Sequence, residues 1–443
     1  MIGVKTVIKA AAKPAAMASR PSTYGAPPPA GVDEFFAYLP MHQYIFVPTR
    51  ELWPAVSAKR SLGVRRKATD YLDKHRAVAQ MTWAPGLPTI IENEVVSNGG
   101  WIASPGYATF NLYRPPKVEP GDPLDVGPWL THLIRMFDSD VEHLLDWLAH
   151  RVQQPGSKVN HALVLGGGQG IGKDTVLEPL KCAIGPWNFS EVSPTQVLGR
   201  FNGFIKSVIL RLSEARDLGE VDRYSFYEHT KVLTAAPPDV LRCDEKNLRE
   251  YSVMNCTGVI ITTNHKNDGI YLPPDDRRHF VAWSNLTKEE LGADYFRELY
   301  GWYEKGSAAN VAAYLRARDL SRFDPKAPPP KTEAWHDIVN GSRVPEDANL
   351  ADVLDACQWP DAITLDGLAA TANANFYSDF AQFILDRKNR RGIPHRLESA
   401  DYVPVRNRDA KDGLWRIQGR RQSVYARRQL SEGARLDAAR RLA

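Results

Sequence analysis

Cysteine is scarce in this sequence, and the few cysteines that occur form no pattern. The 443 residues contain four, which are far apart and include no C-x-x-C pair. A disulfide framework and a cysteine-based zinc site are therefore excluded as the basis of the fold, and a reducing compartment fits. Long apolar runs are lacking as well, so we expect no segment to cross a bilayer and no membrane partner. The cysteines are Cys182, Cys243, Cys256 and Cys357.

Acidic residues are missing from one end of the chain and few at the other. Residues 1–32 contain four Lys or Arg, many Ala and Pro and no acid, which predicts a disordered basic tail. A transit peptide has a similar composition. Residues 387–443 contain 16 Lys and Arg against 6 Asp and Glu, a net charge of +10, so the rest of this +4 chain carries −6. A basic region on a mildly acidic body predicts a docking surface for nucleic acid.

Glycine is concentrated at one place near the middle of the chain. An apolar run at 162–165 predicts a buried strand, the glycine-rich run 166–172 follows, and Lys173 opens a predicted helix. This order is that of a phosphate-binding loop, in which backbone N–H groups surround an anion and the lysine reaches the β- and γ-phosphates. The helix N-terminus adds partial positive charge. We therefore expect ATP to bind through Gly167, Gly168, Gln169, Gly170, Ile171, Gly172, Lys173, Asp174 and Thr175.

One position of this loop departs from the usual template. The spacing from Gly167 to Gly172 and Lys173 fits, but Asp174 stands where a Ser or Thr hydroxyl normally holds Mg²⁺. Asp174 could reach the metal directly or through water, or Thr175 could take over that role. The alternative interpretation of these residues is a glycine-rich turn between a strand and a helix, with no ligand.

A carboxylate follows the next apolar strand. Residues 208–212 predict a core strand, and Glu214 lies just after it. Ligands of open parallel sheets bind outside the carboxyl ends of the strands, so we expect Glu214 to polarise the attacking water. Related motors usually carry two acids here, and this chain has Ser213 before Glu214. A surface glutamate at a strand end is the alternative. The candidate Mg²⁺ ligands are Asp174, Thr175, Ser213 and Glu214.

A third strand and an arginine pair complete the series. Residues 258–263 are rich in β-branched side chains and predict a buried strand that ends on Asn264, which could orient water against the γ-phosphate. Arg277 and Arg278 lead into another apolar strand. An arginine of this kind can stabilise phosphoryl-transfer charge in a neighbouring subunit, and a salt bridge with a nearby aspartate is the alternative. The predicted catalytic residues are Lys173, Glu214, Asn264, Arg277 and Arg278.

This order of motifs resembles the superfamily 3 helicases of viruses, phages and plasmids, and among them the phage and prophage primase-helicase group with a D5-like domain. The resemblance covers about residues 162–280. It implies an AAA+-like P-loop fold, hydrolysis of ATP with Mg²⁺, a homo-oligomeric ring that is most often a hexamer, and single-stranded or forked DNA as partner. It also implies a protein of the cytoplasm of a bacterial host cell. Whether a separate primase or polymerase works with this chain stays open.

The resemblance further implies a hairpin that touches single-stranded DNA, between the second and third motifs. Residues 231–246 would contribute to it and would move as ATP is hydrolysed. The candidates for contact with DNA are Lys231, Arg242 and Lys246. Cations at a hairpin can neutralise phosphates, and a solvated charged turn is the alternative.

The C-terminal region has the pattern of a small DNA-binding domain. Helical spacing within 351–387 is followed by strand patterns between 402 and 426, with Gly419 in a basic turn. Helices followed by a basic hairpin predict a winged helix, which binds duplex DNA through a helix and a wing. A solvated charged face is the alternative. The candidate phosphate contacts are Arg387, Lys388, Arg390, Arg391, Arg420 and Arg421.

The chain is long enough for two or three domains. We expect an α/β protein, with a P-loop AAA+-like motor, a mixed α/β N-terminal domain and a C-terminal winged-helix-like domain. Apolar spacing predicts two helices before the glycine-rich loop, and they resemble an oligomerising collar. The expected segments are a tail at 1–32, an N-terminal helical and mixed domain at 33–157, the motor at 158–322, a proline-rich linker at 323–345 and the basic domain at 346–443.

With the resemblance, the sequence predicts an ATP-dependent DNA helicase for the replication of a phage, prophage or mobile element. A P-loop nucleotide kinase could also begin with Gly-Lys-Asp-Thr, although the Thr-Thr-Asn strand and the basic C-terminal region argue against it. An initiator or regulator that binds ATP and DNA but barely hydrolyses ATP is the other alternative, because a second acid is missing before Glu214. Turnover of ATP with and without single-stranded DNA separates the three.

Overall fold

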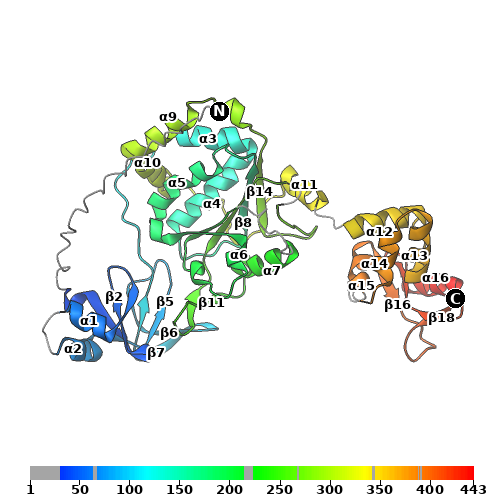
Figure 1. Cartoon of the computed structure of the whole chain (residues 1–443), viewed down its shortest axis with the longest axis horizontal. Helices are drawn as coiled ribbons and strands as arrows, with labels where there is room; N and C mark the ends of the chain where they lie inside the picture. Colours follow the sequence, from blue (N-terminus) through cyan, green and yellow to red (C-terminus); the bar gives the residue numbers. More distant parts are fainter. Residues whose placement is uncertain are drawn as a thin grey trace, which may run out of the picture. The chain divides into compact units, whose positions relative to one another are not determined.

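The computed structural model describes residues 30–62, 67–213, 223–266, 269–341, 345–387, 389 and 392–443. The chain divides into two compact units between Arg114 and Pro115 (Figure 1). The sequence predicts a later end for the N-terminal domain, at residue 157. Among the described residues, none of the helices has the length and apolarity that crossing a bilayer requires.

The first unit is built on two small sheets. One has the strand order β3-β2-β1-β4, in which β1 pairs antiparallel with β2 and parallel with β4. Phe35, Tyr44 and Leu72 are buried in the core of this sheet and its two helices. The other sheet has the order β5-β7-β6. The elements are β1 (Phe35–Tyr38), β2 (Gln43–Phe46), β3 (Glu51–Pro54), α1 (Ala55–Ser61), α2 (Ala68–His75), β4 (Ala77–Val78), β5 (Gln80–Thr82), β6 (Ile90–Ser97) and β7 (Gly100–Asn111).

A five-stranded parallel sheet organises the second unit, which agrees with the predicted α/β class. Its order is β14-β8-β13-β10-β9, and every neighbouring pair is parallel. All residues of β8, β10 and β13 are buried, as expected for strands covered on both faces. A separate hairpin is formed by β11 and β12. The strands are β8 (Ala162–Gly167), β9 (Phe189–Val192), β10 (Ile209–Leu212), β11 (Val240–Cys243), β12 (Tyr251–Met254), β13 (Gly258–Thr263) and β14 (His279–Ser284).

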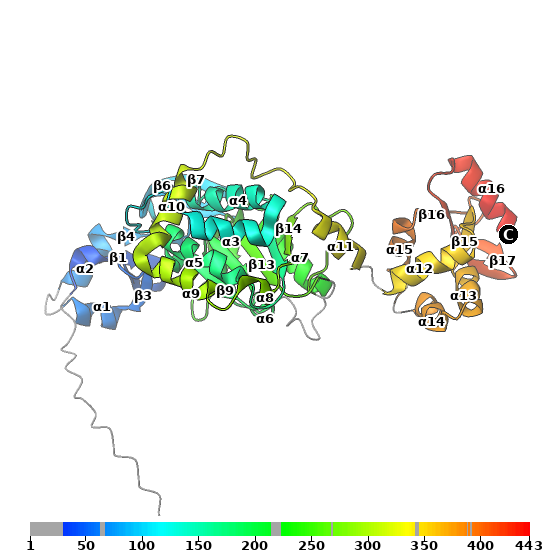
Figure 2. The same cartoon turned by 90° about the horizontal axis from the view of Figure 1, so that it is seen from above.

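Four helices of this unit, α3, α4, α5 and α10, pack against one another (Figure 2). Helix α7 contacts β13, and α11 contacts β14. The sequence analysis assigned α3 and α4 to the N-terminal domain as a collar. In the structure they pack on α5, which follows the glycine-rich loop, and α4 also packs on α10. The helices are α3 (Gly127–Phe137), α4 (Val141–Gln153), α5 (Lys173–Ile184), α6 (Pro194–Val197), α7 (Arg223–Thr234), α8 (Lys288–Leu291), α9 (Tyr295–Trp302), α10 (Ala308–Ala317) and α11 (Glu333–Gly341).

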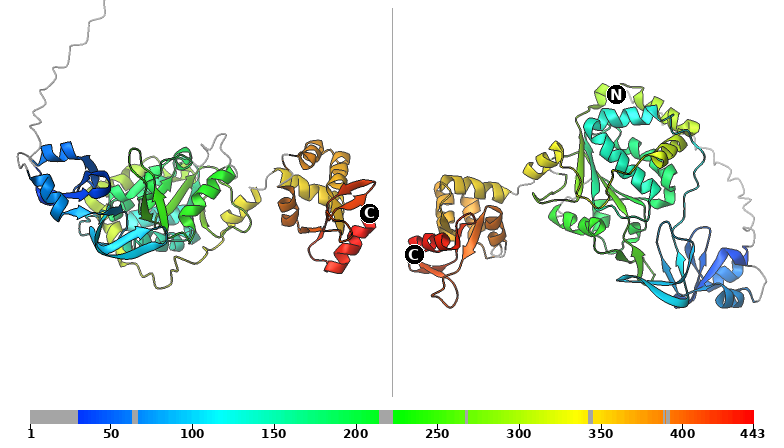
Figure 3. Two further views of the ribbon diagram at one scale, coloured as in Figure 1. Left: turned by 90° about the horizontal axis from the view of Figure 1, so that it is seen from below. Right: turned by 180° about the vertical axis from the view of Figure 1, so that it is seen from behind.

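Residues 345–443 fold into helices and short strands (Figure 3) and have hydrophobic clusters of their own. Their antiparallel sheet has the order β15-β19-β16. The β17–β18 hairpin turns at Gln418 and Gly419, both with positive φ, so the predicted turn at Gly419 is confirmed. Thr364 and Ser431 cap α13 and α16 with their side chains. The elements are α12 (Pro345–Ala356), β15 (Ala362–Thr364), α13 (Leu365–Ala374), α14 (Ser378–Leu385), α15 (Ile393–Ser399), β16 (Tyr402–Val405), β17 (Trp415–Ile417), β18 (Arg420–Gln422), β19 (Val424–Arg427) and α16 (Glu432–Leu442).

Candidate nucleotide-binding site

The glycine-rich loop joins β8 to α5 through residues with a left-handed backbone. Gly167, Gly170 and Gly172 have φ values of 138°, 78° and 93°. A Cβ on Gly172 would lie 2.5 Å from Nε2 of His132, whose ring packs against the loop and contacts the Gly172 carbonyl at 3.2 Å. A Cβ on Gly168 would meet nothing nearer than 3.8 Å. Position 172 therefore requires glycine, because the positive φ and the close approach of His132 both exclude a side chain, whereas position 168 has space for one.

Lys173, the first residue of α5, directs its ammonium back toward the loop. Nζ donates hydrogen bonds to the carbonyl oxygens of Gly167 at 2.8 Å and Gly168 at 2.7 Å, and to Oδ1 of Asn264 at 2.7 Å. The residue is 8% exposed. Burial lowers the pKa of Lys173 to about 8. A partly desolvated ammonium held at the start of a helix is a strong partner for a phosphate oxygen.

Asn264 reaches the lysine because its strand lies directly beside the loop strand. β13 pairs in parallel with β8, with Thr263 opposite Gly166, so both strands end at the same edge of the sheet. The sequence analysis selected Asn264 from its place in the motif series, and the structure brings its amide oxygen to Lys173. This edge, outside the carboxyl ends of the strands, is where open parallel sheets bind ligands.

A cavity of about 350 Å³ opens at this edge. Charged and polar groups converge in it from the glycine-rich loop, from α5 and from the ends of β10 and β13, as ligand sites require. Most of the predicted loop residues are in its lining, together with Asn264 and with five residues that were not selected from the sequence, Arg211, Thr262, Thr263, Phe296 and Tyr300. The lining residues are Gln169, Gly170, Gly172, Lys173, Asp174, Thr175, Arg211, Thr262, Thr263, Asn264, Phe296 and Tyr300.

Helix α9 and the turn after it supply an aromatic wall. The hydroxyls of Tyr300 and Thr175 are 3.0 Å apart, and the Tyr303 hydroxyl donates to the Thr175 carbonyl at 3.0 Å. Nδ1 of His132 lies 3.0 Å from the Tyr295 hydroxyl. Burial lowers the pKa of His132, which keeps the ring neutral next to the loop. The signal in the sequence was the density of aromatic residues at 295–303, a segment assigned to the motor without any site residue being selected in it.

Arg211 is the candidate functional residue that the sequence analysis missed. It lies within β10, and its side chain is 10% exposed. Nη2 lies 2.5 Å from Oδ1 of Asp174, and Nη1 lies 3.1 Å from Oε1 of Glu191. Two sequence features point to it in retrospect. One charged residue interrupts the apolar run 208–212, and the loop carries an acid where a hydroxyl is usual.

The predicted magnesium ligands are brought together only in part. Asp174 and Thr175 lie side by side in the first turn of α5, but the Asp174 carboxylate is paired with Arg211. Ser213 follows β10 and is half-buried, and Glu214 lies outside the described residues. Within the described ranges, no three His, Cys, Asp or Glu side chains gather into a metal site. The described donors fit Mg²⁺ only as a partial set, a carboxylate and a hydroxyl at the start of α5.

Arg277 and Arg278 lie at the opposite edge of the sheet. They precede β14, and its first residue, His279, pairs with Ala162 at the start of β8. The glycine-rich loop follows the other end of β8. The arginine pair is therefore not brought to the cavity of its own chain.

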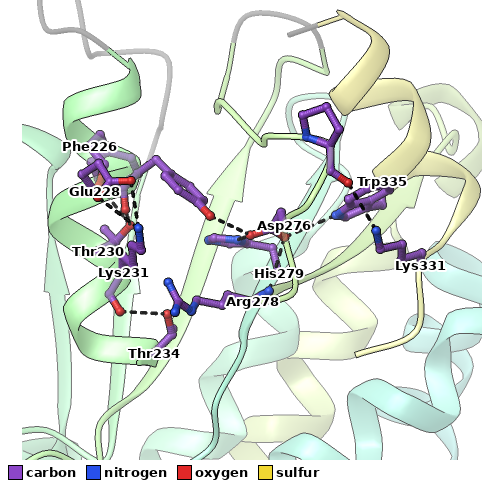
Figure 4. A network of polar contacts seen from close by, with 12 residues as sticks. Phe226, Glu228, Thr230, Lys231, Thr234, Asp276, Arg278, His279, Lys331 and Trp335 are labelled. Atoms are coloured by element: carbon purple, nitrogen blue, oxygen red, sulfur yellow. Dashed lines mark hydrogen bonds and ion pairs between the residues drawn. The ribbon is translucent and has the colours of Figure 1, made fainter. Parts of the chain in front are cut away.

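A buried carboxylate fixes the backbone just before the arginine pair's strand (Figure 4). Asp276 accepts hydrogen bonds from the Tyr227 hydroxyl at 3.2 Å and from Nε1 of Trp335 at 3.3 Å. It also lies 3.0 Å from Nδ1 of His279 and accepts the backbone N–H of Arg278 at 3.4 Å. Burial favours a raised pKa for Asp276, but His279 and the hydrogen bonds outweigh it and lower the pKa below its usual value. The backbone of Arg278, rather than its guanidinium, contacts this aspartate, which ties α7, α11 and β14 together.

Strands β11 and β12 form a hairpin that overlaps the later part of the predicted segment 231–246. Arg242 lies on β11 with Nη2 3.5 Å from Oε2 of Glu250, and Lys246 is exposed in the turn between the strands. Lys231 is not on the hairpin. It lies in α7, where Nζ is 3.1 Å from Oε1 of Glu228. Of the three predicted DNA contacts, the structure therefore places two on the hairpin.

Three of the six C-terminal cations fall within the described residues. Arg387 is exposed just after α14, and Arg420 and Arg421 form the start of β18 with side chains 82% and 74% exposed. Arg421 pairs in register with Arg416, and its Nη1 lies 3.0 Å from Oδ2 of Asp412. The predicted residues outside the described part of the chain are Lys388, Arg390 and Arg391.

Comparison with known proteins gives a family match for the central segment. Residues 165–278 match the model of a family of unknown function, DUF5906. The matched segment begins inside β8 and ends at Arg278, so it contains the whole series of motifs selected from the sequence. No curated protein matches the chain.

Solved structures with a similar fold extend the comparison to most of the chain. The apo structure of the NrS-1 C terminal region (305–718) has a TM-score of 0.61 and 16% identity, and the match covers 89% of this chain and 95% of that chain. An A form apo structure of the same region has a TM-score of 0.61 and 16% identity, covering 89% and 96%. At this identity the likeness shows a shared fold, and it includes residues on both sides of the family match.

Proposed function

We propose that this chain is an ATP-dependent DNA helicase of the superfamily 3 type that serves the replication of a phage, prophage or related element. The observation that carries the proposal is the Lys173 ammonium, which lies between the carbonyls of the glycine-rich loop and Asn264 of the adjacent strand. A buried cation between a left-handed glycine loop and the end of a parallel strand suits the terminal phosphates of a nucleotide. The fold shared with the NrS-1 C terminal region extends over 89% of this chain and so supports a likeness beyond the motif series alone.

In this proposal, different residues of the cavity have different roles in ATP hydrolysis. The loop N–H groups and Lys173 bind the phosphates, while Asn264 holds a water molecule against the terminal phosphate. Asp174 and Thr175 are the described oxygen donors for Mg²⁺, which supplies charge neutralisation at the phosphates when bound. Glu214, outside the described residues, is the proposed base that polarises the water.

Two surfaces are proposed to hold DNA. On the β11–β12 hairpin, Arg242 and Lys246 contact the backbone of a single strand. In the C-terminal region, the β15-β19-β16 order with the β17–β18 hairpin between β16 and β19 suits a winged helix. Arg420 and Arg421 would then lie on the wing, where they contact duplex phosphates.

The arginine pair requires a neighbour. Because Arg277 and Arg278 lie at the sheet edge remote from the loop of their own chain, they act on ATP only in a ring, where they face the cavity of the adjacent subunit. We propose a homo-oligomeric ring, a hexamer by the family resemblance, that draws one DNA strand past its hairpins.

The test is ATP hydrolysis with and without single-stranded DNA, for the natural chain and for Lys173→Ala. We expect turnover that rises with DNA and is lost in the variant. Lys181→Ala is the matched control, because Lys181 lies in the same helix but pairs with Glu178 at 2.8 Å, away from the cavity lining. Undiminished hydrolysis by Lys173→Ala would rule the proposal out.

One observation favours a second candidate, an initiator that binds ATP and DNA with little turnover. The described residues supply only a partial magnesium site, and the Asp174 carboxylate in it is already paired with Arg211. This candidate predicts ATP binding without hydrolysis, even when single-stranded DNA is present. Turnover that does not depend on DNA and transfers phosphate to a small acceptor would instead indicate a nucleotide kinase.

A further inference from the structure

Arg211 is a cation in the interior of a parallel sheet. All four residues of β10 are buried, and the strand lies between β13 and β9. Burying a guanidinium in such a position costs desolvation free energy unless acidic partners and hydrogen bonds compensate its charge. An apolar residue of similar size would stabilise the sheet equally well. A charged residue retained here therefore needs an explanation beyond packing.

The compensation of this charge is uneven. The Arg211 side chain is 10% exposed, whereas its partners Asp174 and Glu191 are 60% and 46% exposed. Nη2 also donates to Oγ1 of Thr262 at 3.4 Å, and Nε is buried with no hydrogen-bond partner among the described residues. The strand holds the cation in place, while the two acids reach it from more exposed positions. Another anion that enters the cavity can therefore replace a carboxylate without moving the arginine.

A second cation faces the same cavity. Lys173 and Arg211 both line it, the first from the start of α5 and the second from β10. Two cations that repel each other across one cavity gain most from a ligand with several negative charges. Arginine adds a planar fork that suits two phosphate oxygens, which a lysine cannot match.

We propose that Arg211 is a phosphate-reading residue that contacts the terminal phosphate of a nucleoside triphosphate bound to its own chain, and that Asp174 is the carboxylate which this phosphate displaces. The inference rests on the proposed nucleotide site. It explains two departures together, an acid in place of the usual loop hydroxyl and an arginine inside an apolar strand. In this proposal Arg277 and Arg278 act on the nucleotide of a neighbouring subunit, whereas Arg211 acts on the nucleotide of its own chain. Arg211 is then the residue that distinguishes a nucleoside triphosphate from a diphosphate.

The test is equilibrium binding of fluorescent ATP and ADP analogues in EDTA, with melting temperatures measured in the absence of nucleotide. We expect Arg211→Gln to weaken ATP binding by roughly 10- to 100-fold and ADP binding by less than about threefold, since one charge-assisted contact is lost only for ATP. Asp174→Asn removes the competing carboxylate, so it should tighten ATP binding more than ADP binding. In the double variant that gain should disappear, because the two residues act on each other.

One control variant and three further outcomes complete the test. Arg200→Gln removes an exposed arginine paired with Asp244, 3.1 Å away, and should leave the ATP-to-ADP ratio unchanged. An equal loss of ATP and ADP affinity in Arg211→Gln would overturn the inference and leave the pair as a structural contact. If Arg211→Gln does not fold, Asp174→Asn and Arg211→Lys still decide, because an unchanged ATP-to-ADP ratio in both would overturn it. A natural chain that binds neither nucleotide would instead overturn the proposed function itself.

Discussion

The molecule holds cations in two contrasting ways. In the cavity, Lys173 and Arg211 are almost buried and each is surrounded by protein oxygens at hydrogen-bond distance. On the β17–β18 hairpin, Arg420 and Arg421 extend into solvent, and among the described residues each has a single acidic partner, at 4.0 Å and 3.0 Å. Buried cations can recognise the geometry of a ligand, because their positions are fixed and the dielectric is low. Exposed cations recognise charge density, and salt screens them.

The largest effect is expected from a substitution that distorts the glycine-rich loop of the buried site. Gly172→Ala places a methyl group 2.5 Å from Nε2 of His132 at a φ of 93°. We expect nucleotide affinity to fall on the order of 100-fold, since the loop must shift or carry strain of ~1–3 kcal/mol or more. Titration with a fluorescent nucleotide measures it. As a control for stability, Gly168→Ala should leave the melting temperature nearly unchanged, because its Cβ has space. Equal melting temperatures in the two variants, or an unchanged nucleotide affinity in Gly172→Ala, would contradict the predicted role of the loop conformation.

The next effect separates the two groups of cations by pH. The pKa of Lys173 is about 8, so the ammonium is mostly charged at pH 7 and mostly neutral at pH 9. Because phosphate binds the charged form, nucleotide affinity should fall as pH rises through 8, by roughly tenfold at pH 9. DNA binding through arginines should not change over this range, because guanidinium groups stay protonated. Lys173→Arg should flatten the pH profile of nucleotide binding, and an unchanged slope would show that another group titrates.

A smaller effect is expected on the exposed hairpin. Replacing both Arg420 and Arg421 by Gln should weaken duplex DNA binding by about fivefold at moderate salt and make the salt dependence shallower by about 1.8 in log–log slope. Nucleotide affinity should stay the same in this variant. Binding measured across a series of salt concentrations tests the prediction. A parallel shift with the original slope would mean that neither arginine contacts a phosphate.

The smallest effect concerns acid stability of the part that carries the parallel sheet. Burial lowers the pKa of His143 and His150 to about 4 and that of His161 to about 3. These rings are neutral in the folded chain but take up protons near pH 6.5 when unfolded, so stability should fall as pH drops from about 6.5 to about 4. His150→Phe should reduce the loss of melting temperature between pH 7 and pH 5 by a few degrees. The exposed His395→Gln is the control, and identical pH slopes in both would disprove the assignment.

The glycine-rich loop, Glu214 and Asn264 could be selected from the sequence because each follows a predicted apolar strand, whereas the arginine pair precedes one. Parallel strands carry the residues that follow them to one edge, and the contact between Lys173 and Asn264 is the result. Arg211 was not predicted, because it lies within a strand rather than after one. A single arginine in an apolar run resembles an outward-facing residue, and its pairing with Asp174 depends on the angle at which α5 leaves the loop, which no local spacing encodes.

The boundary between the two units is a second feature that the sequence pattern did not predict. Helical spacing identified α3 and α4 correctly as elements, since their apolar residues recur at the helical period. Their assignment to the second unit depends on packing against later helices, since both contact α5 and α4 also contacts α10. Periodicity reports that a face is buried, but not which partner buries it.

The position of β8 in the sheet bears on how this protein is made. Both of its neighbours, β13 and β14, follow it far along the chain, and Leu163 pairs with Ile260 and with Phe280. On a ribosome, β8 emerges long before the strands that pair with it, so it has no partner until β13 (Gly258–Thr263) has left the exit tunnel and no second partner until β14 has followed. Such long-range parallel pairing is slow and leaves apolar strands unpaired in the meantime. Production of the chain should therefore depend on chaperones and on low temperature during synthesis more than that of a helical protein of equal length.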